Sequence, residues 1–232
     1  GRGGGDGTGR SARSVAHRGG ALLADEASLG EAVEREHGRL RDVEYRQERE
    51  RLGGNARFTE RFRHLEQLAA QIAVERALVL KAEIELFNAE YCATLDRGNV
   101  EDWPMFFVED AVYRVTSREN ADLNLPVGLV YAEGRDMMHD RAVAIARTQM
   151  YAPRYMLHLV TDVRVISEED NGDIEAEGNF MLMQTLVEGP STVHLVGNYF
   201  DTFTRVEGRL MLKERQVIFD TSILANDLVF PV

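Results

Sequence analysis

The sequence NVEDWPMFFVEDAVYRVTSREN, residues 99–120, decides the fold that we predict for this chain. Asn99 and Asp102 have the spacing of a helix capping box, and Pro104 is tolerated only in a first helical turn. The helix is therefore short, although its aromatic residues carry more apolar surface than one turn can hide. Across residues 111–116 apolar and polar side chains alternate, which is typical of a strand. We expect a short helix that packs on a large core and leads into the first strand of a sheet.

Composition limits the class of protein. The chain has 232 residues, of which 44% are hydrophobic, so it can form one domain with a sizeable core. Residues 71–232 hold 14 Arg and Lys against 27 Asp and Glu, and such an acidic domain argues against nucleic-acid binding. No apolar run approaches the roughly 18 residues of a membrane span, no signal peptide opens the chain, and a lone cysteine forms no internal disulfide. We therefore expect a cytoplasmic protein that binds neither nucleic acid nor membrane.

Residues 1–57 are predicted to form an N-terminal extension. Residues 1–20 are rich in glycine, arginine and serine, which predicts disorder. The segment Ser28–Leu52 carries dense charge of both signs and a thin apolar stripe of Leu29, Val33, Leu40 and Val43. This pattern fits an exposed helix closed by Gly53 and Gly54, and it also fits a solvated segment, so both interpretations stay open.

A long helix is predicted to begin at Thr59, whose side chain can cap the first turn. Its apolar residues lie three or four apart in one stripe: Phe62, Leu65, Ala69, Ala73, Ala77, Leu80, Ile84, Phe87, Tyr91 and Leu95. At about 1.5 Å per residue the helix is roughly 50 Å long, more than a small domain covers. We therefore expect a kink, or a first half that packs on a partner, before Gly98 ends the helix.

The second half of the chain has the pattern of a sheet. After a short strand at 129–132 and a helix from Gly134 to Arg147, four long strands are predicted at 155–166, 174–187, 192–206 and 209–220. Tight turns such as Asn171-Gly172 join them, which makes the sheet antiparallel. Helices followed by a curved sheet define an α+β domain over residues 58–232. A sheet wrapped over one long helix forms a cone, which would bury Phe87, Tyr91 and Trp103.

The residue types give little support for metal or nucleophilic chemistry. A Rieske cluster requires two cysteines and two histidines, and Cys92 is the only cysteine. An iron site would have to draw on His139, His158 and His194, but the carboxylates near them do not repeat a known ligand spacing. No nucleophile elbow or glycine-rich nucleotide loop occurs. We expect no catalytic residue, metal or cofactor in this chain.

General acid–base catalysis is the strongest enzymatic alternative. A cone often has a pocket at its wide end, where a His–Asp or Tyr–Asp pair could dehydrate or isomerise a small molecule. The candidates are Tyr113 with Asp110 and His158 with Asp162. The same residues also have structural interpretations, in which Asp110 ends a helix, Tyr113 packs and His158 binds nearby backbone.

Two arginines have a carboxylate close in the sequence. Arg141 follows Asp140, and Arg215 lies shortly before Asp220. Arginines that are buried or half-buried pair with carboxylates or bind carbonyl oxygens, and such groups recur at protein interfaces. We expect these residues to hold the fold or a subunit interface rather than to bind a substrate.

Taken together, several motifs resemble one family over roughly residues 82–232. They are Trp103-Pro104-x-Phe106-Phe107, Tyr113-Arg114-Val115, Arg118-Glu119-Asn120, Met138-x-Asp140-Arg141, Arg154-Tyr155-x-x-His158, Gly197-x-Tyr199-x-Asp201-x-Phe203, and Arg215 with Asp220. In this order they are similar to the small, or β, subunit of Rieske-type aromatic-ring-hydroxylating dioxygenases. The Leu125-Pro126 stretch looks most like the branch that acts on carboxylated arenes such as salicylate, anthranilate or terephthalate.

The resemblance implies a nuclear-transport-factor-2-like cone and an α3β3 hexamer. In that assembly the α subunit carries the Rieske cluster and the non-haem iron, and the β subunit is chiefly structural. We therefore predict a non-catalytic subunit of an oxidoreductase complex in aromatic-compound catabolism. The structural or interface candidates are Trp103, Tyr113, Arg114, Asp140, Arg141, His158, Arg215 and Asp220. A stand-alone dehydratase or isomerase, and a pure binding domain, stay open as alternatives.

Overall fold

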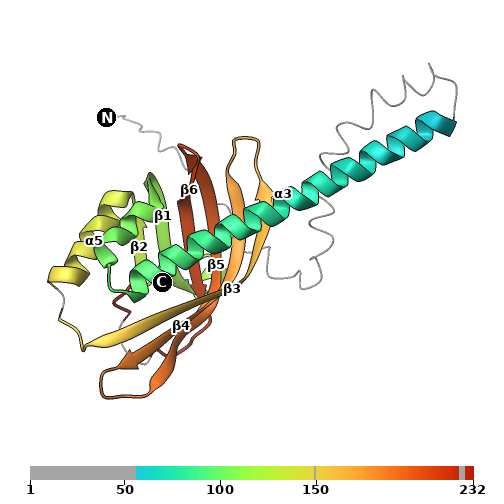
Figure 1. Ribbon diagram of the computed structural model, residues 1–232. Coiled ribbons are helices and arrows are strands. Elements are labelled where there is room, and N and C mark those ends of the chain that lie inside the picture. Colours follow the sequence, from blue (N-terminus) through green and yellow to red (C-terminus); the bar gives the residue numbers. More distant parts are fainter. Residues whose placement is uncertain (1–55, 149, 225–227) are drawn as a thin grey trace, which may run out of the picture.

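The computed structural model describes residues 56–148, 150–224 and 228–232 (Figure 1). Both interpretations of Ser28–Leu52, and the disorder predicted for residues 1–20, lie outside the described residues. The domain boundary predicted at residue 57/58 falls at the start of a helix that begins at Ala56. None of the helices in the described part of the chain is long and apolar enough to span a membrane.

Helix α3, Ala56–Asp96, is the long helix predicted from the apolar stripe. It is one element without a break, and Thr59, predicted as its N-cap, lies inside it. Gly98 follows its end with φ of 81°, a conformation that glycine adopts without steric cost. The stripe divides into two parts, because Leu80, Ile84, Tyr91 and Leu95 are buried, whereas Leu65 is 53% exposed. The first half of α3 projects beyond the sheet (Figure 1).

The opening stretch forms the 3-10 helix η2, Val100–Phe106, and strand β1, Phe107–Ser117. The capping box predicted at Asn99 does not form, because the Asn99 side chain makes no cap hydrogen bond. The strand begins at Phe107, earlier than the alternation predicted, because aromatic packing continues from η2 directly into β1. Trp103 and Phe107 are both fully buried.

Three short elements follow. The helix α4, Arg118–Asp122, was not predicted; the Ser117 side chain caps it by accepting a hydrogen bond from the Asn120 amide. Strand β2, Val130–Glu133, and helix α5, Arg135–Arg147, match the predicted strand and helix to within one residue.

Four strands form the predicted meander: β3 (Arg154–Glu168), β4 (Ile174–Leu186), β5 (Ser191–Val206) and β6 (Arg209–Phe219). Gly172, in the predicted Asn171-Gly172 turn, has φ of 84°, which explains why glycine stands there. The pairs β3–β4, β4–β5 and β5–β6 are all antiparallel.

The complete sheet has six strands in the order β2-β1-β6-β5-β4-β3. The prediction of an antiparallel sheet is wrong in one respect, because β1 lies parallel to β6. The two strands are far apart in the chain, so no hairpin turn constrains their direction. In this register Tyr113 lies opposite Arg215, and Asp201 of β5 lies opposite Arg215 on its other side.

The curved sheet wraps the second half of α3, and η2 and α5 close the same side (Figure 1). Tyr91 and Trp103 are fully buried as predicted, and Phe87 is partly buried against the same core. Most ring pairs pack edge to face, for example Trp103 with Tyr113 at 5.0 Å between centroids, whereas Phe180 and Tyr199 stack face to face at 4.7 Å. The architecture is the predicted α+β cone.

Candidate functional site

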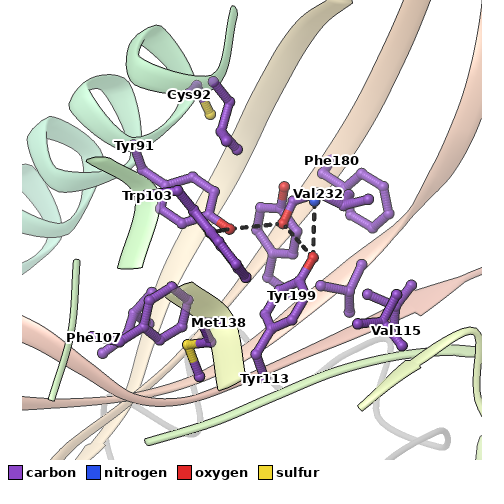
Figure 2. Packing of buried hydrophobic residues seen from close by; sticks show 14 of the residues in the cluster. Tyr91, Cys92, Trp103, Phe107, Tyr113, Val115, Met138, Phe180, Tyr199 and Val232 are labelled. Carbon is purple, nitrogen blue, oxygen red and sulfur yellow. Dashed lines mark hydrogen bonds between the residues drawn. The ribbon is translucent and has the colours of Figure 1, made fainter. Parts of the chain in front are cut away.

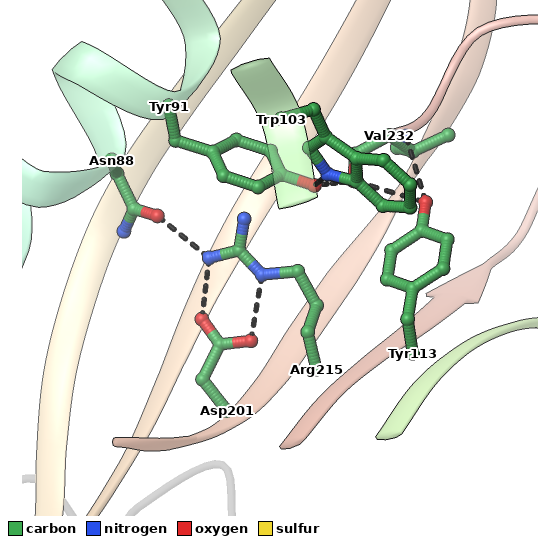
Figure 3. A network of polar contacts seen from close by, with 7 residues as sticks. All are labelled: Asn88, Tyr91, Trp103, Tyr113, Asp201, Arg215 and Val232. Carbon is green, nitrogen blue, oxygen red and sulfur yellow. Dashed lines mark hydrogen bonds and ion pairs between the residues drawn. The ribbon is translucent and has the colours of Figure 1, made fainter. Parts of the chain in front are cut away.

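Arg215 lies in the centre of the cone with no part of its side chain exposed (Figure 3). Its Nε and Nη2 atoms donate hydrogen bonds to the two carboxylate oxygens of Asp201 at 2.9 and 2.7 Å. Nη2 also donates to Asn88 Oδ1 of α3 at 2.7 Å. This bidentate geometry is the strongest form of a charge-assisted hydrogen bond. Together the contacts of Arg215 join β5, β6 and α3.

The guanidinium of Arg215 is also enclosed by aromatic rings. Its Cζ atom lies 4.4 Å from the centroid of Tyr91 and 4.2 Å from that of Tyr199. Burial by itself would lower the pKa of Arg215, but the charge and hydrogen bonds of Asp201 outweigh it and raise this pKa well above its usual value. Burial raises the pKa of Asp201, whereas the charge and hydrogen bonds of Arg215 act to lower it. The interior therefore contains an ion pair that joins three elements, in which Arg215 Nη1 is buried without a hydrogen-bond partner among the described residues.

The pairing expected from sequence proximity is wrong for Arg215, since Asp201 and not Asp220 is its partner. Asp220 instead pairs with Arg118 Nε at 2.9 Å, at the surface. Strand alternation carries a signal that would have shown this, because positions 215 and 220 differ by an odd number and point to opposite faces. Asp201 lies on the inner face with the buried Tyr199 and Phe203.

The last residues of the chain lie inside the cone, a feature that the sequence analysis did not predict (Figure 2). Val232 is fully buried, and its carbonyl oxygen accepts a hydrogen bond from Tyr91 Oη at 3.0 Å. Its amide donates to Tyr113 Oη at 2.8 Å. Trp103 Nε1 donates to Tyr91 Oη at 2.8 Å and so completes the chain of contacts.

Two further side chains bind the backbone of this C-terminal segment, residues 228–232. His158 Nε2 lies 3.2 Å from the carbonyl oxygen of Pro231, and Arg141 Nη2 donates to the carbonyl oxygen of Val229 at 3.2 Å. Arg141 therefore binds a carbonyl oxygen, one of the two modes expected, and the neighbouring carboxylate of Asp140 is exposed. The predicted Asp140–Arg141 pairing is accordingly not the contact that orients this arginine.

His158 also connects strand β3 to the end of α3. Its Nδ1 atom lies 2.7 Å from Asp96 Oδ1, and its backbone amide donates to the same carboxylate at 3.1 Å. The imidazole is almost completely buried, with 1% of the side chain exposed. Asp96 was not among the predicted residues, although it follows the buried Cys92 by one helical turn and so lies on the core side of α3.

The acid–base pairs considered for a dehydratase do not form. Asp110 is exposed on β1, and Asp162 accepts a hydrogen bond from Asn179 at the surface. Tyr113 is fully buried, and burial raises the pKa of its phenol to about 12. Such a phenol stays protonated and has no accessible face, which argues against Tyr113–Asp110 as a catalytic pair. His158 contacts Asp96 and not Asp162, so the second pair does not form either.

A hollow of about 450 Å³ lies between α3 and β3, and Cys92, Asp96 and His158 are among its lining residues. Both ring nitrogens of His158 are already within hydrogen-bonding distance of oxygen atoms. Burial raises the pKa of Cys92 to about 12, so this cysteine stays a thiol and is a poor nucleophile. Within the described residues, no three His, Cys, Asp or Glu side chains gather in a way that could hold a metal ion.

The remaining candidate, Arg114, lies on β1 and is partly exposed. Its Nη2 atom donates to the carbonyl oxygen of Leu125 at 2.8 Å. It therefore holds the Leu125-Pro126 loop against the sheet. The eight candidates thus divide between the interior network and more exposed positions, with Asp140 on the outside of α5, rather than forming one site.

A curved sheet around a filled interior defines the class of cone-shaped α+β proteins, and comparisons with known proteins place the chain within it. A family model described as the ring hydroxylating beta subunit matches residues 91–226. The small subunit of anthranilate 1,2-dioxygenase from Burkholderia cepacia is 35% identical over 150 residues, which are 65% of this chain and 92% of that protein. The beta 2 subunit of the terminal oxygenase component of terephthalate 1,2-dioxygenase from Comamonas sp is 31% identical over 155 residues, 67% of this chain and 100% of that one.

Solved structures give the same result. A crystal structure described as the beta subunit of an aromatic-ring-hydroxylating dioxygenase from Novosphingobium aromaticivorans has a TM-score of 0.62 and 33% identity, and covers 67% of this chain and 99% of that one. A structure described as a scytalone dehydratase from the same organism, at 20% identity and a TM-score of 0.53, covers 68% of this chain and 95% of that one and shares the fold alone. The chain belongs to the family of ring-hydroxylating β subunits.

Proposed function

We propose that this chain is the structural β subunit of an aromatic-ring-hydroxylating dioxygenase and binds an iron-containing α subunit in an α3β3 hexamer in the cytoplasm. Besides membership of the family, the proposal is supported by the interior of the cone, where polar side chains are already occupied. Five side chains, from Tyr91, Tyr113, Arg141, His158 and Arg215, are engaged by the chain's own groups where a cone enzyme would need free ones. Rieske and mononuclear iron chemistry would come from the partner, because one cysteine is too few for a cluster.

An apolar patch on the outer face of the sheet supports the assembly role. Tyr155, Leu157 and Leu159 of β3 point outward and are 70%, 50% and 44% exposed. In the sheet register Leu159 lies opposite Met181 of β4, which is 37% exposed, so the patch continues across strands. Apolar surface of this kind is typical of subunit interfaces, and we propose that the α subunit covers it.

The substrate class that we propose is a carboxylated arene. The relatives described above include small subunits of dioxygenases named for anthranilate and terephthalate, and both names denote aromatic carboxylates. The ring would be bound and oxidised in the partner, so this chain would affect the reaction only by stabilising the complex.

Purification with and without the partner tests the proposal. The chain expressed alone should be colourless, contain no stoichiometric iron and be inactive on arenes. Expressed with the α subunit from the neighbouring reading frame, it should co-purify in equal number, and the native mass should correspond to α3β3. One iron per lone chain, or turnover of a small hydroxy acid by the metal-free chain, would overturn the structural role.

A pair of matched variants locates the interface. Leu157→Asp places a charge in the outer patch and should abolish co-purification while the lone chain keeps its melting temperature. Leu123→Asp is the control, because Leu123 is similarly exposed, at 62%, but lies after α4, away from the patch. Equal co-purification of both variants would show that β3 does not face the α subunit.

A further inference from the structure

Helix α3 carries a second apolar stripe that the cone does not use. It consists of Leu68, Ile72, Val79 and Leu86 together with Leu65, which also belongs to the first stripe. These residues are between 46% and 69% exposed, and we call this stripe the apolar seam. Its members are separated by three, four or seven residues, the spacing of a coiled-coil seam. At 100° per residue the seam lies on the side of α3 opposite the buried Ile84. The seam therefore faces away from the sheet.

Ion pairs hold α3 in the orientation that exposes the seam. Arg76 Nη2 lies 2.6 Å from Glu168 Oε1 at the end of β3, and Arg205 of β5 binds both carboxylate oxygens of Glu83 at 2.7 and 2.5 Å. Together with the buried side chains of Ile84 and Tyr91, these contacts favour the orientation in which the seam faces away from the sheet. Among the residues of α3 whose side chains the structure describes, Leu80 is the first buried one, so the helix from Ala56 to Val79, about 36 Å long, lies largely beyond the core.

The part of the chain that carries the seam lies before the residues that the family model matches. The terephthalate dioxygenase subunit and the Novosphingobium structure are covered almost completely, at 100% and 99%, yet each covers only 67% of this chain. The family match begins at residue 91 and ends at 226, close to the C-terminus, so the excess lies mainly at the N-terminal end. Most of the seam and the residues before it thus lie outside the part of the chain that these two relatives match.

We propose that Ser28–Leu52 folds back as a helix along the apolar seam and forms an antiparallel helical hairpin with the first half of α3. The segment would be about 37 Å long as a helix, which matches the uncovered part of α3. Gly53 and Gly54 lie between it and the start of α3 at Ala56, and a short connection of this kind is typical of two antiparallel helices.

The apolar positions of the two segments are in register about Gly54. Leu40 and Leu68 lie equally far before and after Gly54 in the chain, and the same holds for Val43 with Leu65 and for Leu29 with Val79. Folding the chain at the glycines therefore brings these three pairs of apolar side chains opposite one another, whereas Ile72 lies opposite Glu36. Tethering through a short connection raises the effective concentration of the segment at the seam to about millimolar.

Glu75 favours the segment Ser28–Leu52, rather than a second copy of the chain, as the occupant of the apolar seam. It occupies a seam position between Ile72 and Val79, and its carboxylate accepts a hydrogen bond from Gln71. A parallel coiled coil of two α3 helices would place Glu75 against its own equivalent, and like charges at such positions disfavour pairing. In the hairpin the residue opposite Glu75 is Val33, which carries no charge.

Disulfide trapping in the full-length chain tests the hairpin. Val43→Cys combined with Leu65→Cys should form an intramolecular bond under mild oxidation, and the product should migrate as a monomer at every protein concentration. Val43→Cys with Arg63→Cys is the matched control, since Arg63 is near in the chain but on the opposite side of α3. The native Cys92 is buried and does not compete. Equal rates for the two pairs would overturn the proposal, and so would a concentration-dependent dimer.

Hydrogen exchange gives an independent measurement. Amides of Ser28–Leu52 should exchange more slowly than in an unfolded chain, and Leu68→Asp should reduce that protection at least about tenfold, because it buries a charge in the seam. Gln67→Asp, one position away and off the seam, should leave the protection unchanged. Exchange at the unfolded rate in the parent chain would overturn the hairpin. These outcomes do not depend on the proposed α subunit.

Discussion

At the scale of single residues, Arg215 shows how the interior of the cone is stabilised. The guanidinium is fully buried, hydrogen-bonded to Asp201 and Asn88, and stacked between two tyrosine rings. A buried ion pair is weak evidence for net stability, because desolvation offsets much of the attraction. Removing only one partner destabilises the protein more strongly, since it leaves an uncompensated charge in the core.

Arg215→Met should therefore lower the free energy of unfolding by about 3–5 kcal/mol, measured by chemical denaturation. Replacing both partners, Arg215→Met with Asp201→Leu, should recover much of this loss, because no buried charge is left unpaired. The control is Arg205→Met, whose ion pair with Glu83 is partly exposed and should contribute about 1 kcal/mol or less. A loss below about 1 kcal/mol for Arg215→Met would show that the pair is not closed to solvent.

At the scale of elements, the C-terminal segment joins the helices to the sheet. Tyr91 of α3, Tyr113 of β1, Arg141 of α5 and His158 of β3 each bind its backbone. Buried main-chain groups require partners, and these four side chains supply them from four different elements. The segment therefore acts as a common point of attachment for the whole cone.

Alkaline pH should loosen this attachment. Burial raises the pKa of Tyr113 from 10.0 to about 12, so the fold favours the neutral phenol. A pKa raised on folding means that the contribution to stability is complete below pH 10 and is lost as pH rises toward about 12. For this one residue the loss is roughly 2–3 kcal/mol. Measuring the free energy of unfolding at several pH values across this window should show the fall.

Tyr113→Phe should be less stable at neutral pH by about 1–3 kcal/mol, because the Val232 amide loses its acceptor, and its stability should fall less steeply above pH 10. Tyr155→Phe is the control, because Tyr155 is 70% exposed on the outer face of β3 and should leave the pH dependence unchanged. An identical alkaline slope in Tyr113→Phe and the parent chain would contradict the assignment of Tyr113 to this effect.

At the scale of the whole molecule, the cone and the first half of α3 are energetically distinct. The buried core begins at Leu80, and the residues before it that the structure describes are exposed or only partly buried. Apolar burial is the main source of folding stability, so the cone should depend little on the N-terminal third of the chain.

A chain that starts at Arg57 should therefore melt within a few degrees of the full-length protein in scanning calorimetry. About 1 kcal/mol corresponds to a shift of roughly 2–4 °C for a domain of this size, so a small effect is measurable. The helical hairpin proposed above agrees with this expectation, because it packs on the projecting half of α3 and not on the cone. A large fall in melting temperature would show that residues 1–56 pack on the cone itself.

The sequence by itself determined the elements and the family. The buried stripe of α3, the Asn171-Gly172 turn and the four-strand meander all follow from periodicities or turn residues that act over a few positions. The α+β cone follows from their order. The motifs around Trp103 and Tyr113 indicated the family for the same reason. The order of residues within each motif is visible in the sequence, whatever those residues contact in the fold.

Only the tertiary structure decided which distant residues meet. The parallel pairing of β1 with β6, the Asp201 partner of Arg215 and the Asp96 partner of His158 join positions far apart in the chain. So do the contacts of Val232, for which the sequence carried no local signal. Burial of half of one apolar stripe on α3 depends on where the sheet ends along the helix, and exposure of the apolar seam depends on which side of the helix the sheet covers. Local periodicity records which face of an element is apolar, but the surface that covers it is set by the packing of the whole chain.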